Sequence, residues 1–124
     1  MDQFQSTQPI YLQIMERIKK EIVSEHLLPQ QQLPTVRDLA LQYQVNPNTV
    51  QRALSELERL DLVKSDRTIG RFVSDDLELI QSLRQQMIME KVETFVDELV
   101  QLKVSQEESI NYINQAFKER NQND

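Results

Sequence analysis

The chain has 124 residues and a net charge of −6, with no cysteine and a single histidine, His26. A chain of this length forms one compact domain, or a small domain with an appendage. Without cysteine there is no disulfide, and one histidine excludes a site that needs several imidazoles, so neither a metal site nor a cofactor is expected.

The charge is spread unevenly along the chain. Residues 1–75 hold nine Lys and Arg against ten Asp and Glu, whereas residues 76–124 hold five against ten. Because phosphate contacts act within a Debye length of roughly 8–10 Å, the nearly neutral first part is compatible with nucleic-acid binding. No apolar run approaches a membrane span and no secretion signal is recognisable, so we expect a cytoplasmic protein without a membrane partner.

The first predicted helix begins near Pro9. The residues before it, 1–8, are polar and unpatterned, which predicts a flexible N-terminal arm. Proline suits the first turn of a helix. Apolar residues then recur at the spacing of one helix face, at Tyr11, Ile14, Ile18 and Ile22.

Two further helices are predicted, joined by a tight turn. The first begins after Thr35, whose hydroxyl can cap it, with Asp38 at the third position of a capping-box-like pair. The turn at residues 44–45 leads to Asn46, a favoured N-cap residue, and Pro47, a favoured first helical residue. This layout predicts a helix-turn-helix, whose second helix can enter the major groove of DNA.

That second helix is predicted to turn polar side chains outward. Its periodicity buries Val50, Leu54 and Leu57, and leaves on the opposite side Asn48, Gln51, Arg52 and Ser55. Amide and guanidinium groups can form paired hydrogen bonds with adenine or guanine, so this side is the candidate base-reading surface.

A β-hairpin is predicted next. The β-prone runs 62–64 and 71–73 flank a connection that holds Arg67 and the only glycine of the chain, Gly70. Three helices followed by a hairpin form a winged helix-turn-helix, which we assign to residues 9–75. The tip of such a wing can enter the minor groove or hold phosphates.

Residues 76–120 predict a helical arm of two helices. A long helix of about 28 residues starts near Asp75, a capping box of Ser105 and Glu108 starts the second, and residues 121–124 are expected to fray. The apolar stripe of this arm would be costly in water, at about 1.5–3 kcal/mol for each large side chain, so pairing with a second copy is expected. The predicted dimerisation residues are Leu83, Met87, Val92, Phe95, Val96, Leu99, Ile113 and Phe117.

Four ordered blocks of sequence together resemble one family of bacterial regulators. They are PIYLQI at 9–14, LPTVRDLA at 33–40, VNPNTV at 45–50 and GRFV at 70–73. In this order and spacing they resemble the GntR family of transcription regulators. The start of the third helix and the 49 residues that follow residue 75 are most similar to its YtrA-like subfamily, in which a short helical arm forms the dimer.

The resemblance implies a mostly α-helical, sequence-specific DNA-binding transcription regulator. It implies a homodimeric repressor on a pseudo-palindromic operator in double-stranded DNA. Together with the patterns above, it places at the DNA Thr35, Arg37, Asn46, Asn48, Thr49, Gln51, Arg52, Arg67, Thr68 and Gly70. The arm is too short to enclose a sizeable metabolite cavity by itself, so no small-molecule effector is assigned.

Three residues differ from those usual in the family. Gln44 stands in the helix-turn-helix turn where glycine is usual, and a positive φ there would cost on the order of 1 kcal/mol. In the wing, Thr68 and Arg71 replace a glycine and a threonine.

Two other classes of function were weighed. An enzyme is not expected, because the chain shows no nucleophile and base pattern, no glycine-rich phosphate loop and no paired carboxylates in a plausible cleft. The alternative to DNA binding is a winged helix that acts as a protein-interaction module. The acidic total charge and the altered wing leave that alternative open.

Overall fold

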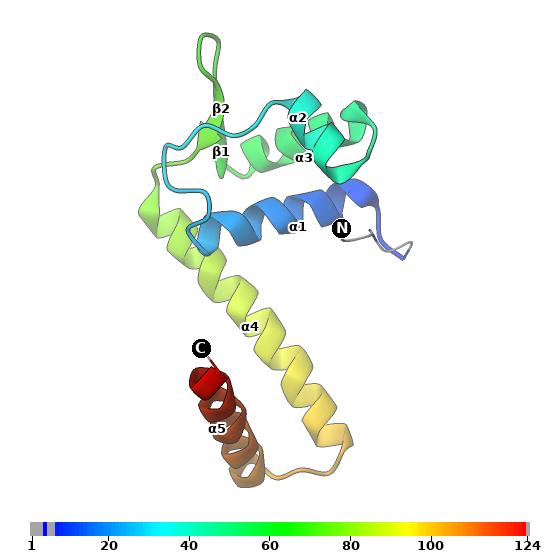
Figure 1. Cartoon of the computed structure of the whole chain (residues 1–124), viewed down its shortest axis with the longest axis vertical. Helices are drawn as coiled ribbons and strands as arrows, with labels where there is room; N and C mark the ends of the chain where they lie inside the picture. Colours follow the sequence, from blue (N-terminus) through cyan, green and yellow to red (C-terminus); the bar gives the residue numbers. More distant parts are fainter. Residues whose placement is uncertain (1–3, 5–6, 124) are drawn as a thin grey trace. The chain divides into compact units, whose positions relative to one another are not determined.

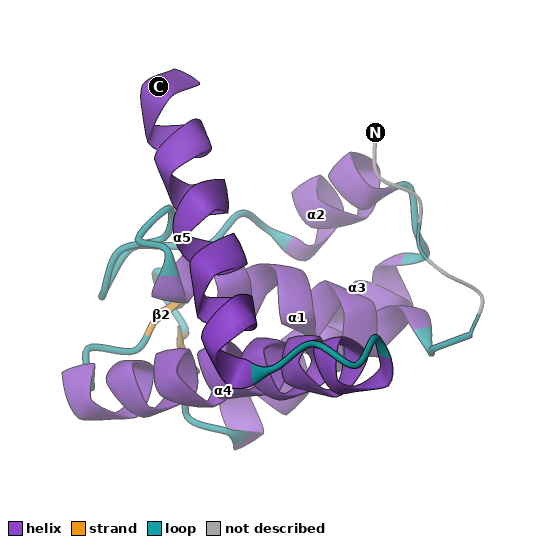
Figure 2. Cartoon of the chain, turned by 90° about the horizontal axis from the view of Figure 1, so that it is seen from below, coloured by secondary structure: helices purple, strands orange, loops and turns teal. Residues whose placement is uncertain are grey.

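The structure is a computed structural model that describes residue 4 and residues 7–123. In chain order its elements are α1 (Ile10–Val23), α2 (Val36–Tyr43), α3 (Pro47–Arg59), β1 (Val63–Asp66), β2 (Gly70–Val73), α4 (Leu77–Gln101) and α5 (Gln106–Asn123) (Figure 1). Helix predominates (Figure 2). The two short strands form one antiparallel hairpin. The expected mostly α-helical fold with a winged helix-turn-helix is confirmed.

The chain forms two compact units, one ending at Arg84 and the other beginning at Gln85. The first unit therefore extends nine residues past the predicted limit at 75. The reason lies in the start of α4, where Leu79 and Ile80 are half-buried and Leu83 is buried. Leu83, which we predicted at the dimer interface, is thus already covered within the single chain.

The core of the first unit lies where α1 and α2 pack against α3. Ile14 and Ile18 from α1 are almost fully buried, as are Val50, Leu54 and Leu57 from α3. Each such side chain contributes about 1.5–3 kcal/mol when it leaves water. This confirms the predicted apolar faces of both helices.

The turn between α2 and α3 has a positive φ at the residue where glycine is usual in the resembling family. Gln44 ends α2 in the left-handed region, with φ 57° and ψ 50°. Its backbone N–H donates to the carbonyl of Ala40, which closes the helix end. The turn therefore holds a non-glycine residue where glycine would be free of steric strain.

The wing is an antiparallel hairpin with a third, short partner. Val63 pairs with Val73 and Asp66 with Gly70, so residues 67–69 form the tip. On its other edge, β2 pairs with the connection between α1 and α2, where Leu33 N–H donates to Arg71 O and Val73 N–H to Gln31 O, both at 2.9 Å.

The second unit consists of the remainder of α4 and of α5. Ser105 caps α5 as predicted, because its hydroxyl oxygen accepts from the Glu108 N–H at 3.1 Å. Two boundaries differ from the prediction: α4 has 25 residues and starts at Leu77, and α5 continues to Asn123 instead of fraying at 121. No helix of residues 7–123 is both long and apolar enough to cross a membrane.

Part of the predicted flexible arm is packed on the first unit. The ring of Phe4 meets the ring of Tyr43 edge-on, with centroids 6.0 Å apart, and the Arg17 guanidinium lies 4.2 Å from the Phe4 centroid. Residues 1–3 and 5–6 lie outside the described part of the chain.

Candidate nucleic-acid interface

Two of the predicted site residues begin the helices of the helix-turn-helix. The Thr35 hydroxyl oxygen accepts from the Asp38 N–H at 3.1 Å, and Asn46 Oδ1 accepts from the Asn48 N–H at 2.8 Å. These bonds satisfy backbone donors that a helix start leaves unpaired. Both side chains are exposed and keep a donor, the hydroxyl proton of Thr35 and the amide NH₂ of Asn46, for an outside acceptor.

The outer face of α3, which we define as Asn48, Gln51, Arg52 and Ser55, is exposed as predicted. The opposite side of the same helix is the core, so this face cannot be turned inward. Thr49 is half-buried and lies at the edge of the face. The face offers amide, hydroxyl and guanidinium groups in three successive turns, a set that matches hydrogen-bonding base edges.

Arg52 is held by an aromatic ring from another helix. Its guanidinium carbon lies 3.8 Å from the centroid of Tyr11 on α1. A cation over a ring at this distance is attracted by about 0.5–1 kcal/mol at an exposed site. The helical spacing of Tyr11 predicted a core position and not this contact, because nothing in the spacing of residues 11 and 52 indicates it.

Outside this face, Arg37 in the first turn of α2 and Arg67 at the wing tip carry free charges. Both are exposed, and neither has an ion-pair partner among the residues that the structure describes. Other cations are neutralised locally: Arg59 pairs with Glu56 at 2.9 Å and Lys19 with Glu16 at 3.4 Å. Arg37 and Arg67 therefore keep their charges available to phosphate.

The wing tip is ordered by a carboxylate that the sequence analysis did not single out. Asp66 Oδ1 accepts from the Thr68 N–H at 2.8 Å, the Thr68 hydroxyl at 2.6 Å and the Ile69 N–H at 3.2 Å. These bonds, above all that from the Thr68 hydroxyl, hold the pKa of Asp66 below its usual range. Thr68 thus uses its hydroxyl proton within the turn.

Gly70 closes the tip with φ +99°, a conformation that L side chains rarely adopt. Gly70, which we predicted at the DNA, is therefore required first by the backbone conformation of the turn. Arg67, which lies within this turn between Asp66 and Thr68, is the charged side chain that the tip presents.

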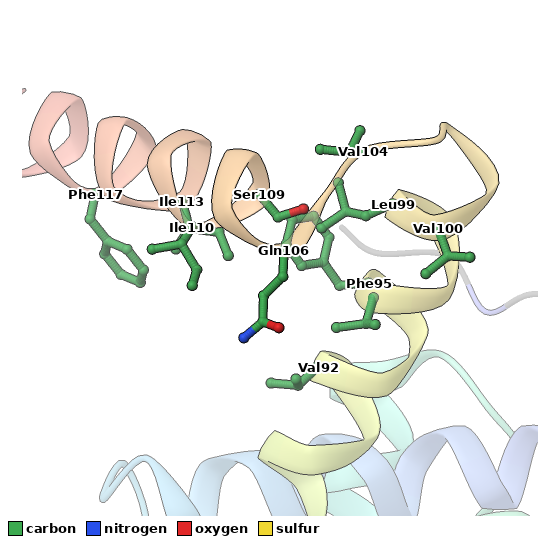
Figure 3. A pocket seen from close by; sticks show the side chains of 11 residues that line it. Val92, Phe95, Leu99, Val100, Val104, Gln106, Ser109, Ile110, Ile113 and Phe117 are labelled. Atoms are coloured by element: carbon green, nitrogen blue, oxygen red, sulfur yellow. The ribbon is translucent and has the colours of Figure 1, made fainter.

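The second unit holds an apolar groove between α4 and α5, with a volume of about 540 Å³ (Figure 3). We call it the arm groove. Six of the predicted dimerisation residues line it: Val92, Phe95, Val96, Leu99, Ile113 and Phe117. Val100, Val104 and Ile110 also line it and were missed, whereas Met87 lies outside it.

The described residues hold no cluster of three or more side chains that could bind a metal ion. The chemistry that the first unit offers on α3, the start of α2 and the wing is hydrogen bonding and positive charge.

A winged helix-turn-helix with this surface defines a DNA-binding regulator, and comparison with known proteins identifies which kind. The model of the bacterial gntR family of regulatory proteins matches residues 10–73. The chain belongs to this family of DNA-binding transcription regulators.

Two curated relatives come from Bacillus subtilis. The HTH-type transcriptional regulator YhcF is 42% identical over 109 residues, which cover 88% of this chain and 90% of YhcF. The HTH-type transcriptional repressor YtrA is 38% identical over 71 residues, which cover 57% of this chain and 55% of YtrA. The expected likeness to YtrA-type regulators is thus confirmed. Both relatives are named as transcription regulators and not as enzymes.

Two solved structures extend the comparison. A GntR family regulator from Listeria monocytogenes has a TM-score of 0.83 at 32% identity and covers 90% of this chain and 98% of its own. The DNA-binding domain of AraR, solved in complex with an operator, has a TM-score of 0.53 at 31% identity over 60% of this chain and 87% of its own. The first supports the fold along nearly the whole chain, and the second shows a similar domain on DNA.

Proposed function

We propose that this chain is a homodimeric repressor that acts in the cytoplasm and binds a pseudo-palindromic operator. The observation that carries the proposal is the exposed polar outer face of α3, which lies opposite a fully apolar core face. A capped helix with amide and guanidinium groups turned outward is suited to the major groove.

Each part of the surface has a role that follows from its chemistry. Arg52 can form a bidentate pair with guanine, and Asn48 and Gln51 can pair with adenine, each contact discriminating by about 1–3 kcal/mol. Arg37 and Arg67 carry free charges that can contact phosphate or the minor groove. Thr35 and Asn46 support the two helix starts and can add backbone contacts.

The arm groove supports the dimer. Phe95 and Val96 of α4 are 44% and 46% exposed, and Phe117 of α5 is 63% exposed. Contiguous apolar side chains of this size are costly in water, and a second copy related by a two-fold axis covers the same groove on both chains. Such a dimer presents two α3 helices to two half-sites, which explains the expected symmetry of the operator.

Repression is supported by the relative YtrA, which is named as a repressor. A dimer that occupies a promoter excludes polymerase from the same DNA, so no further activity is needed.

The test is footprinting of the full chain on the DNA upstream of its own gene and across the genome. We expect protection of an inverted repeat by the wild-type protein. The double variant Gln51→Ala, Arg52→Ala should lose about 1–3 kcal/mol of discrimination for each base contact removed. Lys19→Ala, which removes a cation paired with Glu16, serves as the control and should bind as wild type.

Failure to find a protected inverted repeat anywhere in the genome would reject the proposal. Binding whose affinity does not fall with salt would also count against it, since phosphate contacts release counterions.

A further inference from the structure

One carboxylate links the wing to α3, the helix proposed to enter the major groove. Glu58, near the end of α3, accepts at Oε1 from the Ser65 hydroxyl of β1 and from Arg71 Nε of β2, each at 2.5 Å. A single side chain of α3 therefore holds both strands of the hairpin. Its side chain is 31% exposed and that of Arg71 is 21% exposed, so the pair is partly shielded from water.

The charge state of Glu58 is consistent with this contact. Partial burial raises the pKa of its carboxyl, but hydrogen bonds from Ser65 and Arg71 and the charge of Arg71 outweigh it and leave the pKa lowered. The carboxylate is thus ionised at neutral pH, which strengthens both hydrogen bonds.

The wing is fastened from its other edge by the connection between α1 and α2. Gln32 Nε2 donates to the carbonyl of Ile69, at the wing tip, at 2.5 Å. Two backbone hydrogen bonds between residues 31–33 and β2 accompany this contact. The same amide lies 3.6 Å from where a Cβ on Gly70 would stand, so it covers the glycine of the tip.

We propose that Glu58 and Gln32 are positioning residues that fix the wing tip relative to α3. The spacing between α3, which binds the major groove, and the wing tip, which binds the neighbouring minor groove, is then set before DNA binds. A two-stranded hairpin with four residues in each strand is marginal by itself. Side-chain contacts at both edges remove the cost of ordering it when DNA binds. The proposal rests on the proposed DNA contact of Arg67, which it deepens by naming what holds that contact in place.

The test uses full-length variants on the operator. Glu58→Ala removes both hydrogen bonds to the strands, and Gln32→Met keeps the size of the side chain but removes the donor. Glu56→Ala is the matched control, because it makes the same charge change on the same helix and disturbs only the pair with Arg59. Arg67→Ala reports on the wing contact itself.

Four measurements are made on each variant: operator affinity, hydroxyl-radical protection of the minor groove, methylation protection of guanines in the major groove, and the unfolding temperature. We expect Glu58→Ala and Gln32→Met to bind about three- to tenfold more weakly than Glu56→Ala and wild type respectively. Both should lose the minor-groove protection that Arg67→Ala also loses, and both should keep the major-groove protection. Glu58→Gln, which retains an acceptor oxygen, should lose less than Glu58→Ala.

The outcomes separate the inference from the proposed function. If Arg67→Ala leaves minor-groove protection unchanged, the proposed wing contact is wrong. If Arg67→Ala abolishes that protection while Glu58→Ala and Gln32→Met keep it, the wing contacts DNA but these residues do not position it. An equal loss in both grooves that follows a lowered unfolding temperature would show a merely structural role and would also overturn the inference.

Discussion

At the scale of single residues, the contact between Arg52 and Tyr11 connects the core of the first unit to its candidate DNA surface. The guanidinium lies 3.8 Å from the ring centroid, and Tyr11 is half-buried on α1. The ring therefore restricts the conformations of the long, flexible Arg52 side chain. Ordering Arg52 before DNA arrives lowers the entropy that it loses on binding.

This arrangement predicts that Tyr11→Leu weakens discrimination between the operator and a variant operator by about two- to fivefold, because an exposed cation–π contact contributes about 0.5–1 kcal/mol. Tyr11→Phe keeps the ring and should behave as wild type. Competition binding with the two DNA sequences measures the effect. Equal losses for Leu and Phe would contradict the role of the ring.

Gln44 gives a second prediction at this scale. Its φ of 57° is strained for a side chain with a Cβ, so Gln44→Gly should raise the free energy of unfolding by about 0.5–1 kcal/mol. Gln42→Gly, in the last turn of α2, should lower it by about 0.5–1 kcal/mol because glycine is a poor helix former. Urea denaturation at one protein concentration compares the two, and the same sign for both would refute the explanation.

At the scale of elements, the attachment of the wing to α3 depends on the ionisation of Glu58. Its pKa is lowered in the folded chain. The stability that this attachment provides is therefore complete above the unfolded pKa, about 4.3, and is lost as the pH falls through the folded value.

We expect the difference in unfolding temperature between wild type and Glu58→Gln to stay constant above about pH 5 and to shrink below about pH 4. Calorimetry across this range measures it. Glu56→Gln makes the same substitution on the same helix at a residue that does not contact the wing, and serves as the control. A difference that persists unchanged to pH 3 would contradict the ionised pair.

At the scale of the whole molecule, the arm groove sets the expected association. Val96 lines the groove, whereas Thr94, two residues earlier on α4, does not. Val96→Asp should therefore shift sedimentation toward monomer and reduce cooperative binding to the two half-sites, because it places a charge in an apolar interface. Thr94→Asp adds the same charge and should remain dimeric. A dimer that tolerates Val96→Asp would exclude the groove as the interface.

The sequence predicted what depends on neighbours in the chain. Thr35, Asn46 and Ser105 cap their helices as expected, because a cap bonds to a backbone group two or three residues away. The apolar faces of α1 and α3 likewise follow from local spacing. The left-handed turn at Gln44 was indicated only by the resemblance to a family that usually has glycine there. Belonging to the GntR family followed from ordered blocks of this kind.

The tertiary structure decided which side chains meet across elements. Tyr11 with Arg52, Glu58 with Ser65 and Arg71, and Gln32 with Ile69 are brought together by packing between segments distant in sequence. The burial of Leu83 and the position of Val104 in the lining of the arm groove also depend on packing between segments. Periodicity fixes the direction in which a side chain leaves its own helix, but its partner is set by the crossing of two elements, which no local pattern encodes.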